Sequence, residues 1–156
     1  MSTLLDISMD HSQELIALCA SHIDTVQRIS YLRSMLDSWL NQTAKIQLFL
    51  SISCTRKMLP LLEREIPTWK KYEDDGLFSY MVTQPRRQFE HYRQLVSVIY
   101  QKVESYRPRN IWIMFTDDDD IWNVTRAAYF SNVVLRVPPE ANYIHIRSTF
   151  ECELDG

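Results

Sequence analysis

Apolar residues along the chain form short continuous runs and, between them, runs spaced by three or four residues. Continuous apolar runs of four to eight residues, rich in β-branched and aromatic side chains, are typical of buried strands. Such runs predict strands over 15–20, 45–53, 77–83 and 111–115. Two later segments, 132–137 and 142–154, have the same character, and the second partly alternates, so strands are predicted there as well.

Two longer segments carry the spacing of amphipathic helices. In 24–42 the apolar residues recur at intervals of three and four, and Asp24 or Thr25 can cap the helix. In 85–106 Pro85 suits the helix start. The apolar face predicted for this second helix comprises Phe89, Tyr92, Val96, Ile99 and Val103.

The remaining segments complete an alternating order of strands and helices. Pro60 and Pro67 interrupt 58–75, which predicts short helical pieces and loop. Segment 122–130 predicts a short helix or a turn. Strands that alternate with helical segments indicate an α/β domain with a mainly parallel sheet. We therefore expect residues 1–156 to form a single domain of this class.

Composition narrows the function classes. The 156 residues suffice for one hydrophobic core, and 46% are hydrophobic and 24% charged, as in ordinary globular domains. A formal net charge of −3 gives no indication of nucleic-acid binding. Neither a signal peptide nor a membrane-spanning run is visible. Cys19, Cys54 and Cys152 are widely spaced and form no paired motif, so reduced thiols and a cytoplasmic location are expected.

The most unusual stretch is "IMFTDDDDIW", residues 113–122, in which four consecutive aspartates follow the most apolar predicted strand. In open α/β sheets, ligands bind at the carboxyl ends of strands, where this run lies. Four adjacent carboxylates repel one another unless water solvates them or a cation sits among them. Their hard oxygen atoms suit Mg²⁺ or Mn²⁺. A solvated surface loop and a cation site therefore remain the two readings.

The segment "IWIMFTDDDDIWNVTRAAYF" resembles the acidic motif of GT-A fold glycosyltransferases of the family 2-like group. That motif has a strand, Asp-x-Asp, a further Asp, an aliphatic residue and Trp, and an arginine that Arg126 matches. The segment 15–53 is similar to the family's opening strand, base-binding loop, helix and second strand. Ser38 and Gln42 fall where the family's helix ends with S-x-x-x-Q. The resemblance implies a Rossmann-like GT-A nucleotide-sugar-binding domain, truncated or minimal.

The resemblance also implies roles for individual residues. Asp117 would begin the Asp-x-Asp and face the ribose, and Asp119 would bind the metal. Asp118 is expected with Asp117 among the nucleotide-sugar-binding residues, and either Asp118 or Asp120 would serve as a supporting acceptor or a helix cap. The loop Ala20, Ser21 and His22 would lie along the nucleotide base. Arg87 and Gln88 would reach the base or a phosphate.

The implied function is metal-dependent transfer of a sugar from a nucleotide diphosphate-sugar donor to a saccharide or other hydroxyl acceptor, with Mn²⁺ or Mg²⁺ as the cofactor. Two departures from the family stand out. The segment "SISCTR" lacks the base-binding carboxylate at the end of the second strand, and no residue is identified as the catalytic base. A non-catalytic nucleotide-binding or interaction module is the alternative. A second alternative is a small α/β protein whose acidic loop binds Ca²⁺ or no ligand. The residue spacing of an EF-hand calcium loop is missing from the sequence.

Overall fold

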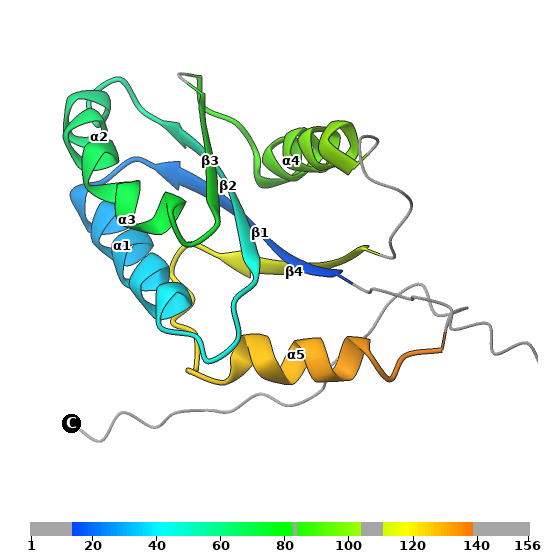
Figure 1. Ribbon diagram of the computed structural model, residues 1–156. Coiled ribbons are helices and arrows are strands. Elements are labelled where there is room, and N and C mark those ends of the chain that lie inside the picture. The colour runs from blue at the N-terminus through cyan, green and yellow to red at the C-terminus, as the bar shows by residue number, and fades with distance from the viewer. Residues whose placement is uncertain (1–13, 83, 104–110, 139–156) are drawn as a thin grey trace, which may run out of the picture.

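The computed structural model of the chain describes residues 14–82, 84–103 and 111–138. Their strands form one four-stranded sheet in which all neighbouring pairs are parallel (Figure 1). The strands are β1 (Glu14–Ile23), β2 (Gln47–Cys54), β3 (Leu77–Val82) and β4 (Ile111–Asp117), in the spatial order β3-β2-β1-β4. The α/β class, the parallel sheet and the first four predicted strands are confirmed.

The helices connect and cover these strands. They are α1 (Val26–Leu40), α2 (Leu59–Glu65), the 3₁₀ helix η1 (Ile66–Trp69), α3 (Lys70–Glu73), α4 (Gln88–Val103) and α5 (Arg126–Val134). The Thr25 side chain caps α1 by accepting a hydrogen bond from the Arg28 amide, so Thr25 rather than Asp24 is the cap. The segment with two prolines forms short helical pieces, as predicted.

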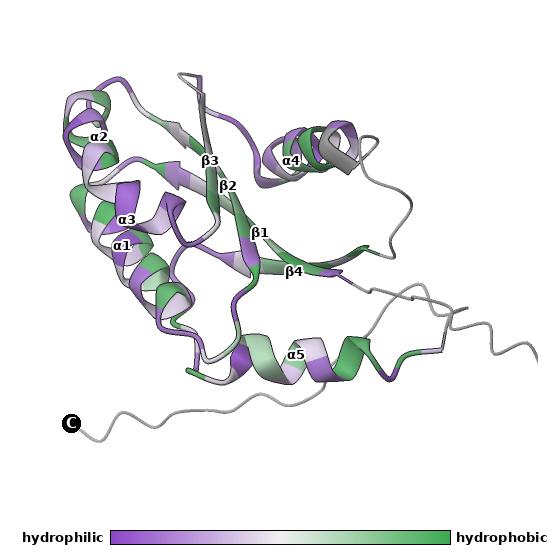
Figure 2. Cartoon of the chain, viewed as in Figure 1, coloured by the Kyte–Doolittle hydropathy of each residue, from purple (hydrophilic) through white to green (hydrophobic). Residues whose placement is uncertain are grey.

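Helices lie on both faces of the sheet, with α4 on one face and the other helices on the opposite face (Figure 1). Successive strand residues point to opposite faces. In β1, Leu15, Ala17 and Cys19 therefore pack in the cluster with α1, while Ile16 and Leu18 pack against α4. A strand covered on both faces needs a continuous apolar run, and Figure 2 shows apolar positions along the strands and on the inner sides of the helices.

The prediction of a strand over 132–137 is wrong. Residues 132–134 form the end of α5, and residues 135–137 form a turn and a bend. Ala127 and Val134 are buried at helical spacing, which joins this apolar run to the preceding helix. A short apolar run does not by itself distinguish a strand from the end of a buried helix. The other late strand prediction, 142–154, lies outside the described residues.

The apolar face predicted for α4 is also wrong in part. Phe89 is 82% exposed and Val96 is 42% exposed, whereas Leu95, Ile99 and His91 are buried. The helix presents a histidine to the sheet because two serines of β2 supply hydrogen-bond partners for its ring. A hydrophobic pattern does not register such a buried polar group. The helix also begins at Gln88, three residues after Pro85.

The strand order creates a switch point between β1 and β4. The chain runs outward from β1 to β2 and β3, and then returns to place β4 on the other side of β1. In open α/β sheets a crevice for ligands forms at such a point, beyond the carboxyl ends of the strands. Here those ends are the segment around Ala20 and the acidic run Asp117–Asp120, which Ala20 meets in register through Asp117.

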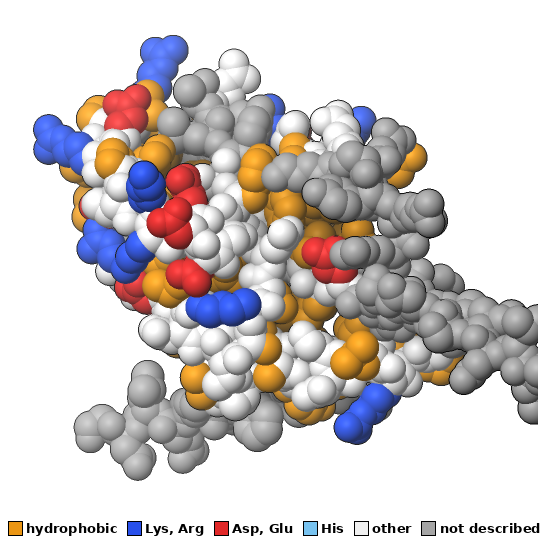
Figure 3. Space-filling model, viewed as in Figure 1, with side chains coloured by type: hydrophobic (Ala, Val, Ile, Leu, Met, Phe, Trp, Pro, Cys, Tyr) orange, Lys and Arg blue, Asp and Glu red, His pale blue; other side chains and the backbone are white. Residues whose placement is uncertain are grey.

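Two properties of the described residues relate to the sequence analysis: the distribution of surface charge, and the length and apolar character of the helices. On the face shown in Figure 3, Lys and Arg side chains are mixed with Asp and Glu side chains over α1, α2 and α3. Among the described side chains of that face, charge therefore does not gather into a basic patch of the kind that binds a phosphate backbone. Within the described part of the chain, none of the helices combines the length and apolar character needed to cross a membrane.

Candidate functional site

A cavity of about 320 Å³ lies at the switch point. Seven of the eight residues expected at the site line it: Ala20, Ser21, His22, Gln88, Asp117, Asp118 and Asp119. Arg87 does not line the cavity; it is exposed, and its backbone amide donates to Glu90 Oε2 at 2.7 Å. The structure thus brings most of the expected residues together, and their roles toward a ligand stay predictions.

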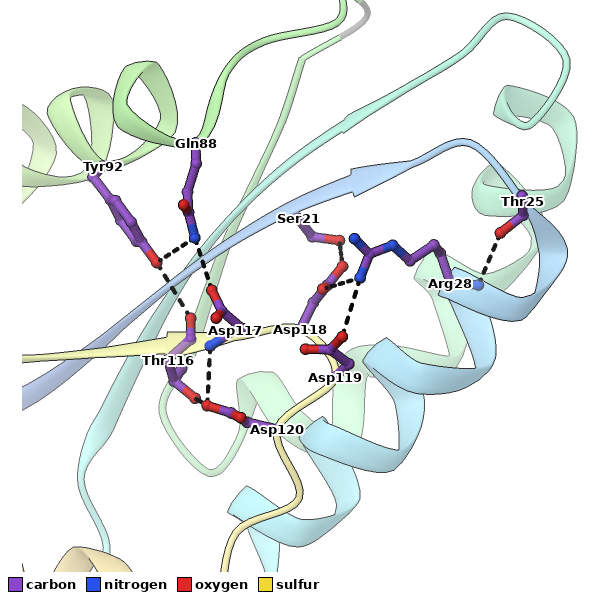
Figure 4. Close-up of polar contacts among 10 residues, drawn as sticks. All are labelled: Ser21, Thr25, Arg28, Gln88, Tyr92, Thr116, Asp117, Asp118, Asp119 and Asp120. Atoms are coloured by element: carbon purple, nitrogen blue, oxygen red, sulfur yellow. Dashed lines mark hydrogen bonds and ion pairs between the residues drawn. The ribbon is translucent and has the colours of Figure 1, made fainter. Parts of the chain in front are cut away.

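The acidic run is a tight turn closed by its last member. Asp120 Oδ2 accepts hydrogen bonds from the Asp117 amide at 3.3 Å and from the Thr116 hydroxyl at 3.2 Å (Figure 4). Thr116 Oγ1 in turn accepts from Trp122 Nε1 at 3.0 Å, and Trp122 is only 3% exposed. Asp120 therefore supports the turn.

Asp118 points inward. It is 3% exposed, and its two oxygens have separate partners. Ser21 Oγ donates to Oδ2 at 2.5 Å, and Arg28 Nη1 lies 2.8 Å from Oδ1 (Figure 4). Burial raises the pKa of the Asp118 carboxyl, while the Ser21 hydroxyl and the Arg28 charge oppose that rise. These two partners make a buried carboxylate tolerable.

Asp117 and Asp119 face outward. Gln88 Nε2 donates to Asp117 Oδ1 at 2.7 Å, which ties the first turn of α4 to the end of β4. The side chain of Asp119 is 54% exposed. Its Oδ2 atom forms an ion pair with Arg28 Nη1 at 3.5 Å. Of the four aspartates, Asp119 therefore has the least engaged carboxylate and lines the cavity with it.

The end of α1 holds the turn in place. Ser38 Oγ accepts from the Trp122 amide at 2.9 Å. The buried Gln42 side chain donates to the Asn123 carbonyl at 2.8 Å and accepts from the Ala127 amide at 2.9 Å. Ser38 and Gln42, singled out by their spacing, thus connect α1 to the segment between the acidic run and α5.

Three further residues line the cavity: Arg28, Arg86 and His91. Arg28 and His91 were not expected from the sequence, whereas Arg86 belongs to the segment "RRQF", 86–89, which the resemblance places near the donor. Arg28 stands in the first turn of α1, where the helix dipole disfavours a cation. Arg86 and Arg87, directly before α4, show the same misfit with a helix dipole, which favours a ligand role at both helix starts. Nothing in the local pattern distinguishes Arg86, which lines the cavity, from Arg87, which does not.

A chain of hydrogen bonds runs from the cavity wall into the core. His22 Nδ1 lies 2.8 Å from Ser53 Oγ, which lies 2.9 Å from His91 Nε2. His91 Nδ1 lies 2.7 Å from Ser51 Oγ, so both ring nitrogens of His91 have partners. The Ser53 hydroxyl has one proton and two lone pairs, so it can donate to at most one of the two histidines. Ser53 therefore couples the ring orientation of His22 to a buried imidazole.

The neutral form of His91 should make the domain less stable in acid. Burial lowers the pKa of His91, and the nearby Arg86 and His22 charges add to that effect. Below the unfolded-state pKa of about 6.5, the unfolded chain takes up a proton that the folded chain resists, so the free energy of unfolding falls as the pH falls. Urea unfolding at pH 7.5 and 5.5 should show a smaller loss for His91→Gln than for the wild type. Equal losses in the two proteins would contradict this assignment.

The described residues contain no group of three His, Cys, Asp or Glu side chains arranged to hold a metal ion by themselves. Magnesium and similar cations often bind through one or two carboxylates together with substrate phosphates. The outward carboxylates of Asp117 and Asp119 fit that arrangement, because they lie in one cavity and are both exposed. The residues present thus suit a cation that a phosphate ligand helps to bind.

Comparisons with protein-family models and with curated protein sequences found no match. A comparison with solved structures found a crystal structure of S. aureus TarS 1-349, at 13% identity and a TM-score of 0.49, covering 77% of this chain and 31% of that one. The structure of the same protein in complex with UDP gives 12% identity, a TM-score of 0.46 and coverage of 76% and 31%. The chain thus spans about a third of those structures. Likeness at this level supports no statement about ligand or activity.

Proposed function

We propose that this domain binds a nucleotide diphosphate-sugar together with Mn²⁺ or Mg²⁺ and serves glycosyl transfer to a saccharide or other hydroxyl acceptor, as expected of a GT-A-like domain. The observation that carries the proposal is the cavity at the switch point, where carboxylates of the acidic run meet Arg28 and Arg86. The nucleotide base would lie along Ala20–His22, and the phosphates would lie toward the acidic run.

The balance of charge in the cavity supports a need for a cation. Its lining holds three carboxylates and two guanidinium groups, so one negative formal charge remains when both histidines are neutral. A diphosphate would be repelled by that excess unless a divalent cation accompanied it. Asp119, with Asp117 beside it, would hold this cation against the phosphates.

Bound there, the cation would supply positive charge that stabilises the departing diphosphate. The chain's own groups have complementary tasks. Arg28 and Arg86 would neutralise phosphate oxygens, and Gln88 would keep Asp117 oriented through its hydrogen bond. Ser21 would hold Asp118 in place beneath the ligand.

One observation favours the alternative, a nucleotide-binding module without turnover. Among the described residues, all carboxylates that line the cavity belong to the acidic run. An inverting transfer needs a general base for the acceptor hydroxyl, and such a base is typically worth about 10²–10⁴-fold in rate. We therefore expect this chain to bind the nucleotide and to transfer the sugar slowly, if it does so at all. Mass spectrometry of reactions with a panel of donors and acceptors distinguishes the two functions.

Nucleotide and cation together should stabilise the fold. At a ligand concentration about 100 times the dissociation constant, binding raises the free energy of unfolding by about 2.7 kcal/mol. For a domain of this size that gain corresponds to a rise in melting temperature of about 5–10 °C. The measurement is a thermal-shift titration with UDP and with GDP, with and without Mn²⁺, at constant ionic strength, followed by calorimetry.

The matched controls are the nucleotide alone and Mn²⁺ alone, which should each shift the melting temperature less than the pair. A flat response to every combination would mean that the acidic run is a solvated loop and that the proposed function is wrong.

A further inference from the structure

One nitrogen of Arg28 lies between two aspartates of the acidic run. Nη1 is 2.8 Å from Asp118 Oδ1 and 3.5 Å from Asp119 Oδ2 (Figure 4). The Arg28 side chain is 39% exposed and lines the cavity. A positive charge of the protein therefore already stands beside the carboxylate that is best placed to hold a cation.

This position depends on contacts far away in the sequence. Arg28 lies in the first turn of α1, where the helix dipole disfavours a cation, so its own helix gives no reason for it. The reason is Asp118, whose buried carboxylate accepts from the Arg28 guanidinium at Oδ1. Asp118 thus anchors Arg28, and the anchored guanidinium reaches Asp119 as well.

A divalent cation at Asp119 would have to approach this fixed guanidinium. Like charges a few ångströms apart repel strongly where protein excludes part of the water. The guanidinium also lies 3.5 Å from Asp119 Oδ2, an oxygen that such a cation would need. A bound diphosphate would reduce both the charge repulsion and the competition for Asp119. It brings negative charge, and it brings oxygen ligands that a cation and an arginine can share.

We propose that Arg28 is a resident counter-ion of the acidic run that suppresses divalent-cation binding until a diphosphate is present. The cation then binds together with the diphosphate rather than before it, and Arg28 sets that requirement. The inference rests on the proposed function for the identity of Asp119 as the ligand, yet its test needs no nucleotide.

The test is a calorimetric titration of the folded chain with Mn²⁺ alone. Arg28→Met keeps an apolar stem and removes the charge. It should bind Mn²⁺ at least tenfold more tightly than the wild type. Arg33→Met is the matched control, because Arg33 lies on the same helix and pairs with Glu65 on α2, outside the cavity. It should leave the Mn²⁺ affinity unchanged. Adding Asp119→Asn to Arg28→Met should abolish the gain.

A second pair of variants covers the case in which Arg28→Met does not fold because Asp118 loses its partner. Asp118→Asn removes the buried charge but keeps an oxygen that can accept from Arg28, so Asp118→Asn and Arg28→Met/Asp118→Asn can be compared directly. The double variant should bind Mn²⁺ at least tenfold more tightly than the single one. Equal or weaker affinity in the variants that lack Arg28 would overturn the inference.

The outcomes separate this inference from the proposed function. A gain in Mn²⁺ affinity without binding of UDP or GDP by the wild type would leave Arg28 as the counter-ion and refute the function. Nucleotide binding by the wild type without any gain in the Arg28 variants would support the function and refute the counter-ion.

Discussion

Asp119→Asn is expected to weaken Mn²⁺-dependent binding of UDP or GDP by about 100-fold, which corresponds to about 2.7 kcal/mol. The amide keeps the size of the side chain but loses the charge that attracts the cation. The fold should be unaffected, because the Asp119 side chain is 54% exposed and such substitutions change stability by about 0.5 kcal/mol or less. Calorimetry at saturating Mn²⁺ gives the affinity, and a melting curve without ligands checks the fold.

The matched control is Asp74→Asn, the same change at an exposed aspartate that follows α3 and does not line the cavity. It should bind the nucleotide like the wild type. If Asp119→Asn also does so, Asp119 is not a metal ligand and the cation, if one binds, is held elsewhere.

Trp122→Ala is expected to cause the largest loss of stability, about 3–5 kcal/mol, as for other buried tryptophans. Trp122 is 3% exposed, its indole donates to Thr116, and the Arg126 guanidinium lies 4.9 Å from the ring centre. Removing the ring leaves a cavity beneath the acidic turn and leaves Thr116 without this donor. The melting temperature should fall by about 6–20 °C for a domain of this size.

A comparison with Trp69→Ala separates the fold from the site. Trp69 is buried to the same extent but belongs to η1, away from the acidic run. Both variants should lose stability, yet at a temperature where both are folded the Trp122 variant alone should bind UDP with Mn²⁺ more weakly. Similar nucleotide affinities in the two variants would show that Trp122 has no influence on the site beyond the stability of the core.

The hydrophobic pattern predicted the sheet well and the polar contacts poorly. The four strands of the described sheet were predicted because a strand covered on both faces requires a continuous apolar run, which is a local property. The buried face of α4 was predicted wrongly in part because it includes His91, whose ring forms hydrogen bonds with two serines of β2, about 40 positions earlier in the chain. The run over 132–137 was mispredicted because an isolated apolar run has no period of its own.

The sequence by itself determined that an acidic run follows a buried strand, that Asp24 or Thr25 can cap a helix, and that the order of elements requires a mainly parallel sheet. These conclusions follow from local spacing and from the chirality and connection rules of α/β folds. Only the tertiary structure decided how the first three carboxylates of the acidic run are tolerated, because their side-chain partners come from elsewhere in the chain. Asp120 differs, because its neighbours Thr116 and Asp117 donate to it. Arg28 reaches Asp118 across 90 positions, and Ser21 does so across 97. Strand order brings these groups together, and no local pattern encodes which distant polar groups will meet.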